Sequence, residues 1–172
     1  LERFLQLCSN DNMQVLNCTT PANYFHALRR QMHRDFRKPL IIMTPKSLLR
    51  NKHCVSSIDD FGKKNSFHRV LWDHAIDPKS KGFIKLKEAK KIRKVILCSG
   101  KVYFDLIQAR QKLEKDDVVI YRIEQLYPFP VKSLVKEIKQ YAVSAKFFWC
   151  QEEPKNMGAW FSVRDYIQWT LD

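Results

Sequence analysis

The sequence has no long apolar run and little glycine, and both absences narrow its possible functions. No apolar stretch approaches the roughly 18 residues that a membrane-spanning helix needs, so we expect no membrane partner. The four glycines form neither a dinucleotide-binding fingerprint nor a Walker phosphate loop, and no serine stands in a Gly-x-Ser-x-Gly elbow. The residues alone therefore indicate neither a nucleotide-dependent enzyme of these classes nor a serine hydrolase.

The cysteines and histidines lack the spacing of a metal site. No two of the five cysteines lie two to four residues apart, so the usual zinc spacing is missing. His26 and His33 are two helical turns apart, and the other three histidines fall in an irregular region. We therefore expect no metal site. The odd number of cysteines, without a signal peptide, favours a reducing compartment.

What the sequence does have is positive charge. The formal net charge of +13 favours an anionic partner, such as nucleic acid, acidic lipid, nucleotide or acidic protein, although unevenly spread solvated lysines are the alternative. Between Lys79 and Lys94, eight basic residues accompany one acidic residue, Glu88. We interpret this segment as a solvated, mobile connection. It lacks the motifs of a nucleic-acid arm, so we expect no nucleic-acid partner.

The stretch from Lys94 to Pro130 predicts strand, turn, helix and strand. Val95 to Cys98 and Val118 to Ile123 are apolar runs without alternation, as in strands that are buried on both faces. Gly100 permits a tight turn after the first strand. The apolar positions of the helix are 103, 106, 107 and 113. Two strands joined by a helix form a right-handed parallel unit.

The pattern continues to the end of the chain. The run 127–130 predicts a turn, and a helix from Pro130 should follow it. A strand from Ala145 to Cys150 then precedes a last helix, capped by Asn156. The expected buried positions are Val131, Leu134, Val135, Ile138 and Tyr141 in the first helix and Trp160, Val163 and Ile167 in the last. The predicted fold class is α/β, with a three-layer, doubly wound, mainly parallel sheet.

A partial βαβ unit precedes this fold. Strands at Val15 to Cys18 and Leu40 to Met43 flank a helix that begins at Pro21 with Thr20 as its cap. We expect the helix to bury Tyr24, Phe25, Leu28 and Met32 and to expose His26, Arg29, Arg30, His33 and Arg34. One such unit cannot close a core, so it should pack on residues outside this chain. The pattern begins in mid-helix at Leu1, which suggests a fragment.

Three polar clusters follow predicted strands, where ligands gather in open α/β sheets. Ser99-Gly100-Lys101 is either an anion site or a plain turn. Glu124-Gln125 and Gln151-Glu152-Glu153 either do acid–base work or have structural roles, which we favour. Arg29 and Arg30 form a basic helix face that is either solvated or binds phosphate.

Several longer runs of the sequence are unusual: Leu1 to Leu7, Thr20 to His26, Leu28 to Gln31, Arg37 to Arg50, Cys98 to Tyr103, Arg122 to Pro130, Trp149 to Pro154 and Gly158 to Trp160. Together they closely resemble the C-terminal part of the thiamine-diphosphate-dependent decarboxylase component of 2-oxoglutarate dehydrogenase. The resemblance implies that residues 1–48 end a transketolase-like pyrimidine-binding domain. Residues 49–93 would then be an irregular basic connection with the start of the next domain. Residues 94–172 would be a transketolase-type C-terminal domain, cut short at its end.

The resemblance also implies a function for the full subunit. Such subunits are homodimers that decarboxylate 2-oxoglutarate on thiamine diphosphate with magnesium, then pass succinyl to the lipoyl group of the succinyltransferase component. The cofactor ligands would lie outside this chain, so we assign it no catalytic residue and expect it to be inactive alone. The location would be the bacterial cytoplasm, or the mitochondrial matrix in a eukaryote.

Some relatives in this family bind an acyl-CoA effector. Positions that match the effector site are Arg30, Gln125 and Lys132, whereas Ser133 and Arg69 depart from the pattern. The resemblance thus adds a possible acyl-CoA or nucleotide effector. The alternative function is a stand-alone nucleotide- or acyl-CoA-binding regulatory module.

Overall fold

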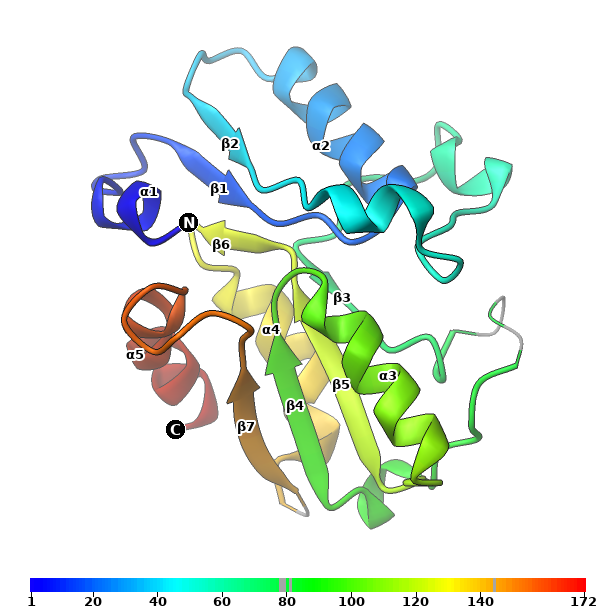
Figure 1. Ribbon diagram of the computed structural model, residues 1–172. Coiled ribbons are helices and arrows are strands. Elements are labelled where there is room, and N and C mark those ends of the chain that lie inside the picture. The colour runs from blue at the N-terminus through cyan, green and yellow to red at the C-terminus, as the bar shows by residue number, and fades with distance from the viewer. Residues whose placement is uncertain (78–79, 81, 144) are drawn as a thin grey trace.

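The computed structural model describes residues 1–77, 80, 82–143 and 145–172. The described residues form a mixed α/β structure with two sheets and five α-helices (Figure 1). The larger sheet has the order β3-β5-β4-β7. Its strands are β3 (Val70–Leu71), β4 (Lys94–Cys98), β5 (Val118–Ile123) and β7 (Lys146–Cys150). β4 is parallel to both β5 and β7, as predicted, and β3 is antiparallel to β5.

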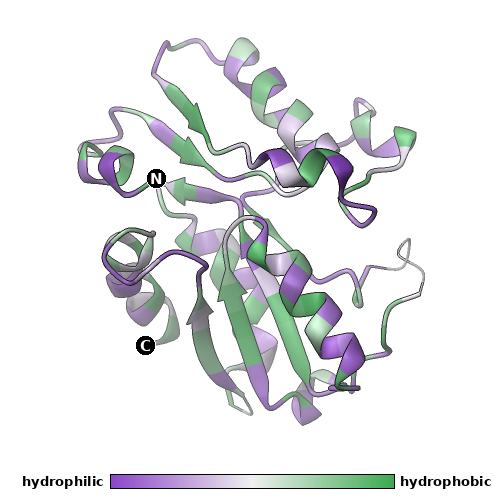
Figure 2. Cartoon of the chain, viewed as in Figure 1, coloured by the Kyte–Doolittle hydropathy of each residue, from purple (hydrophilic) through white to green (hydrophobic). Residues whose placement is uncertain are grey.

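Helices lie on both faces of the larger sheet (Figure 1). On one face, α3 (Val102–Lys112) buries Tyr103, Phe104 and Ile107 against Cys98 and Ile120. On the other, α4 (Val131–Ile138) and α5 (Trp160–Leu171) pack with the main core. The sheet strands are mostly hydrophobic (Figure 2) because both of their faces are covered.

The smaller sheet joins the two halves of the sequence. It has the order β2-β1-β6. β1 (Gln14–Leu16) is parallel to β2 (Leu40–Ile42) and antiparallel to β6 (Gln125–Tyr127). The sequence predicted no strand at β6, which follows β5 almost directly. Two further helices are α1 (Glu2–Gln6) and α2 (Pro21–His33), and Thr20 caps α2 as expected, since its side chain accepts from the Asn23 N–H.

Residues 46–93 are mostly irregular. They include three short 3₁₀ helices, η1 (Lys46–Arg50), η2 (Ile58–Phe61) and η3 (Ala89–Lys91), besides β3. The basic connection predicted between Lys79 and Lys94 falls partly outside the described residues. Within the described part of the basic connection, η3 leads to a buried Ile92, so this end of the segment is anchored. No helix in the described ranges is long and apolar enough to span a membrane.

The predicted buried face of α2 is wrong. The helix buries Ala22, Asn23, His26 and Ala27, while Tyr24, Phe25, Leu28 and Met32 are 38–75% exposed. The two alanines allow close packing, and the Asn23 amide donates to Glu124 and to the carbonyl of His68. Polar anchoring therefore overrides the hydrophobic pattern.

Three smaller expectations also need correction. Leu113 is 63% exposed because α3 ends before it, at Lys112, whereas Arg110 of α3 is buried, paired with Asp73. Val135 of α4 is 39% exposed rather than buried. The last helix begins at Trp160, with Ala159 rather than Asn156 at the cap position, because Gln151 accepts from the Trp160 N–H.

Gly100 lies in a turn that packs against Asn17, in the first part of the chain. Its φ is +76°, and a Cβ atom there would lie 2.4 Å from the Asn17 side-chain nitrogen. We expect Gly100→Ala to lower the free energy of unfolding by about 2 kcal/mol or more, since strain and collision add. Gly82→Ala is the control, because Gly82 has φ +81° but nothing within 4 Å. Equal losses in urea titrations of both variants would refute the role of the Asn17 contact.

Candidate functional site

A basic cleft of about 660 Å³ lies where the end of α2 meets β6 and the start of α4. Four cations and one carboxylate line it, with three aromatic side chains. The cations are Arg34, Lys38, Arg69 and Lys132, the carboxylate is Asp11, and the aromatics are Phe36, Phe129 and Trp169. Basic and aromatic groups together suit a ligand with phosphate groups and a planar ring.

The side chain of Gln14, in β1, accepts hydrogen bonds from two arginines, Arg30 and Arg34. Its side-chain oxygen accepts from Arg30 Nη2 at 3.0 Å and from Arg34 Nη1 at 2.6 Å. The Arg30 guanidinium also lies 4.1 Å from the centre of the Phe67 ring. These contacts fix the positions of the two guanidinium groups relative to β1.

Arg30, Arg34 and Arg69 lie close enough for their positive charges to repel one another, which lowers the pKa of Arg30 and of Arg34. Burial, followed by the charges of Arg34 and Arg69, lowers the pKa of Arg30 to about 10. Burial and then Arg69 lower the pKa of Arg34. None of the ion pairs between described residues includes these three. Arg30 Nη1 and Gln125 Oε1 are buried and find no hydrogen-bond partner among the described residues. An anion in the cleft would relieve this repulsion.

The structure brings together only some of the residues predicted from the sequence. Gln125 and Lys132 line the cleft, and Arg30 lies behind Gln14. Arg29 instead donates to the Asn65 carbonyl at 3.3 Å. Lys101 forms an ion pair with Glu152, outside the cleft lining.

Nothing in the sequence indicated that Lys38 lines the cleft, and Arg34 was placed only on a basic helix face, whereas the resemblance had placed Arg69 at an effector-site position. Arg30 and Arg34 are one helical turn apart, a signal that was available. The position of Arg69 depends on tertiary structure, because its carbonyl accepts from the N–H groups of Glu124 and Gln125.

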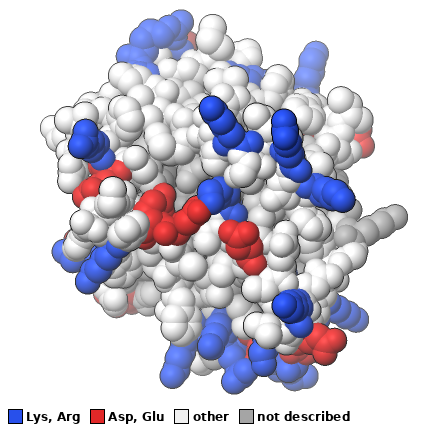
Figure 3. Space-filling model, viewed as in Figure 1, with Lys and Arg blue, Asp and Glu red and all other residues white. Residues whose placement is uncertain are grey.

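Positive charge also gathers where the parallel strands begin, at the lower end of the molecule in Figure 3.

Glu124 and Gln151, which follow β5 and β7, make structural contacts. Glu124 is fully buried, and its oxygens accept from the Thr19 N–H, the Thr19 hydroxyl and the Asn23 amide. Burial raises the pKa of Glu124. Gln151 accepts from Trp149 Nε1 and from the Trp160 N–H. These contacts connect elements of the fold.

Four of the five histidines line a second cavity of about 440 Å³, which we name the histidine cavity. The four are His26, His53, His68 and His74. The sequence did not predict this grouping, because it depends on how residues 51–77 fold over the start of α2. No three histidine, cysteine or carboxylate side chains in the described ranges are placed to hold a metal ion.

His74 should make stability depend on pH. Burial and then Arg122 lower its pKa from 6.5 to about 4. Its contribution to stability is therefore full above pH 6.5 and is lost as pH falls towards 4. From pH 7 to pH 5 we expect a loss of about 2 kcal/mol, which His74→Phe should remove and His33→Gln should leave unchanged. Urea titrations at both pH values test this, and an identical pH dependence in His74→Phe would contradict it.

Comparisons with known proteins cover nearly the whole chain. Residues 55–172 match the family described as 2-oxoglutarate dehydrogenase C-terminal, and residues 1–52 match the transketolase pyrimidine binding domain. The chain is 60% identical over 171 residues to proteins named 2-oxoglutarate dehydrogenase E1 component from Brucella abortus strain S19, Brucella anthropi and Brucella ovis.

These alignments cover 99% of this chain and 17% of each relative, so the chain spans less than a fifth of their length. Such similarity gives no support to a stand-alone regulatory module. The chain belongs to the 2-oxoglutarate dehydrogenase E1 family.

Proposed function

We propose that this chain is the C-terminal region of a subunit that decarboxylates 2-oxoglutarate on thiamine diphosphate and passes succinyl to a lipoyl group. The observation that carries this proposal is the 60% identity to E1 components over 171 residues. The partner would be the succinyltransferase component of the complex. Because the similar proteins are bacterial, we place the subunit in the bacterial cytoplasm.

Within that subunit, we assign this region a structural and regulatory role. Residues 1–48 would complete the pyrimidine-binding domain, 49–93 would connect, and 94–172 would form the three-layer, doubly wound C-terminal domain. Thiamine diphosphate and magnesium would be held by residues of the full subunit that lie outside this chain, and no three histidine, cysteine or carboxylate side chains among the described residues are placed to hold a metal ion. The exposed apolar side of α2 supports burial in a homodimer or against other parts of the subunit.

The basic cleft is our candidate effector site. Its unpaired arginines, the buried Gln125 oxygen without a partner and the exposed Trp169 favour a phosphate-bearing ligand with a planar ring, such as an acyl-CoA or AMP. Arg29 and Lys101, the other two residues that the sequence offered as anion contacts, lie outside this cleft, so the proposed effector site does not include them.

Calorimetric titration of the whole protein with acetyl-CoA and AMP tests the cleft. We expect Arg34→Gln and Lys132→Ala each to weaken binding by about tenfold, because each removes a cation from the lining. Arg29→Gln is the matched control and should bind normally. Binding that is unchanged in both cleft variants would refute the site.

The catalytic proposal has its own test. The whole protein should oxidise 2-oxoglutarate with an artificial electron acceptor when thiamine diphosphate and magnesium are present. Residues 1–172 alone should not. Turnover by the 172-residue chain alone would overturn the assignment of roles.

A further inference from the structure

The α3 side of the larger sheet is covered over β5 but open over β7. There α3 packs on Ile120 of β5, which is 0% exposed, whereas Phe148 of β7 is 44% exposed. Phe148 lies on this side because it alternates with Cys150, which clusters with the buried residues of α3. Figure 1 shows α3 in front of β5 and no helix in front of β7. Parallel sheets normally have helices on both sides, so the described residues leave one side of β7 without its usual cover.

Three apolar side chains make up the uncovered part of the sheet, which we name the β7 face. They are Ile96, Phe148 and Cys150. Ile96 and Cys150 are only partly buried, as is Leu106 of α3, which belongs to the same cluster. β7 is also the last strand in the order of the sheet, with a described neighbour on one side only. An apolar face beside a free strand edge is a place where further polypeptide packs.

Two lysines lie at the start of the β7 face. Lys94 and Lys146 are register partners at the beginning of β4 and β7, and both are exposed. Like charges directly opposite each other on neighbouring strands destabilise a sheet. None of the ion pairs between described residues includes either lysine, and Lys94 Nζ lies 5.6 Å from the centre of the Phe148 ring. The two charges therefore favour a negative group at this end of the face.

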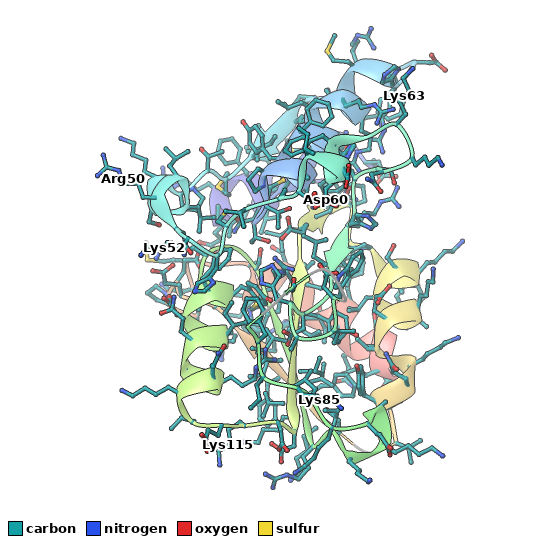
Figure 4. All side chains as sticks on the ribbon, turned by 90° about the vertical axis from the view of Figure 1, so that its right-hand side faces the viewer. Arg50, Lys52, Asp60, Lys63, Lys85 and Lys115 are labelled. Carbon is teal, nitrogen blue, oxygen red and sulfur yellow. The ribbon has the colours of Figure 1, made fainter. Side chains whose placement is uncertain are left out.

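The helix α3 shows how a helix lies on this side of the sheet. It begins at Val102, just after β4, and ends at Lys112, before β5, so it runs opposite to the strands. Figure 4 shows the larger sheet edge-on between α3 and α4, with Lys115, just after α3, at the lower end. A helix in the same orientation on the β7 face would end near Lys94 and Lys146. The carboxyl end of a helix carries a partial negative charge, so it would suit these two cations.

A helix of the same subunit is the cover that fits this face best. The chain spans 17% of the length of its relatives, so most of a full subunit would lie outside residues 1–172. The β7 face has three apolar side chains, whereas a stable complex between separate proteins takes about 20–30 residues a side. A segment of the same polypeptide can pack on so small a face, because it loses no translational freedom in doing so.

We propose that an amphipathic helix of the full subunit, from outside residues 1–172, packs on the β7 face in the orientation of α3. Its apolar side chains cover Phe148 and Cys150, and its carboxyl end, with acidic side chains, lies at Lys94 and Lys146. This inference does not depend on the proposed catalytic function or on the basic cleft.

Thiol labelling of the whole protein with N-ethylmaleimide, followed by mass spectrometry, tests the cover. Cys150 is partly exposed in the described residues. We expect it to react at least about tenfold more slowly than a cysteine placed at the exposed Lys90 by Lys90→Cys. Phe148→Asp should speed up the labelling of Cys150 by about tenfold, because a charge on the face expels the helix. Val143→Asp is the control, because Val143 is 103% exposed and outside the face.

Two labelling results would overturn the proposal. One is labelling of Cys150 as fast as that of Lys90→Cys, and the other is labelling that Phe148→Asp leaves unchanged. Because Phe148 is already 44% exposed, this variant should fold.

Carbodiimide cross-linking of the whole protein, which joins a lysine to a carboxylate in contact with it, identifies the covering segment. We expect products that join Lys94 or Lys146 to a carboxylate outside residues 1–172, in the gel band of a single subunit. Lys94→Gln with Lys146→Gln should remove them. Products found only in the band of two subunits would place a second copy on the face. Products that need the succinyltransferase component would place that partner there, and either result, or no product from these lysines, would overturn the proposal.

Discussion

Replacing Asp73 with alanine is expected to lower the free energy of unfolding by about 3–5 kcal/mol. Asp73 and Arg110 form an ion pair whose side chains are 0% and 3% exposed. The carboxylate also accepts from the backbone N–H groups of Ile120 and Ala75, both at 2.9 Å. Without it, a buried guanidinium and a strand N–H lose their acceptor. Urea titration followed by tryptophan fluorescence measures the loss.

The control for Asp73 is an exposed ion pair. Lys87 and Asp116 lie 3.0 Å apart with side chains 45% and 42% exposed. Asp116→Ala should change stability by about 1 kcal/mol or less. The double variant Asp73→Leu, Arg110→Met should be more stable than Asp73→Ala, because it leaves no unpaired charge. A loss in Asp73→Ala no larger than that in Asp116→Ala would contradict this account.

Glu124→Ala should lower the free energy of unfolding by about 3 kcal/mol, because three donors from the first part of the chain lose one buried acceptor. Hydrogen exchange should speed up first around Thr19 and Asn23, while the amides of β4 stay protected. Glu124→Gln keeps an acceptor and the shape of the side chain, so it should cost much less.

The same carboxylate predicts a pH effect of definite sign. Burial raises the pKa of Glu124, so its contribution to stability is full below the unfolded pKa and is lost as pH rises through the folded pKa. Glu124→Gln should remove this dependence. A pH dependence of stability in Glu124→Gln that equals that of the unmodified protein would contradict this account.

Local sequence patterns were sufficient to predict the three parallel strands β4, β5 and β7. Each of the runs at β4, β5 and β7 is apolar on both faces, and β5 has the predicted bounds. The cap at Thr20 and the turn at Gly100 also follow from residue type alone. The family resemblance was predicted from motifs and is confirmed by the comparisons.

Long-range contacts explain most of what the sequence did not show. The α2 face was misassigned because Asn23 is buried by bonds to Glu124, 101 positions away. β6 was missed because its partner, β1, lies over a hundred residues earlier in the chain. Both cavities gather residues from distant segments, so helical or strand spacing could not reveal them.

The position of β6 has a consequence for dissecting the protein. A cut between residues 52 and 55, where the two family matches meet, would strip β1 of one neighbour and leave its backbone edge open to association with other chains. The two halves are therefore poor candidates for separate expression. Hinge motion between them would have to break the β1–β6 ladder, and the side chains of Gln14 and Gln125, from these two strands, both line the basic cleft.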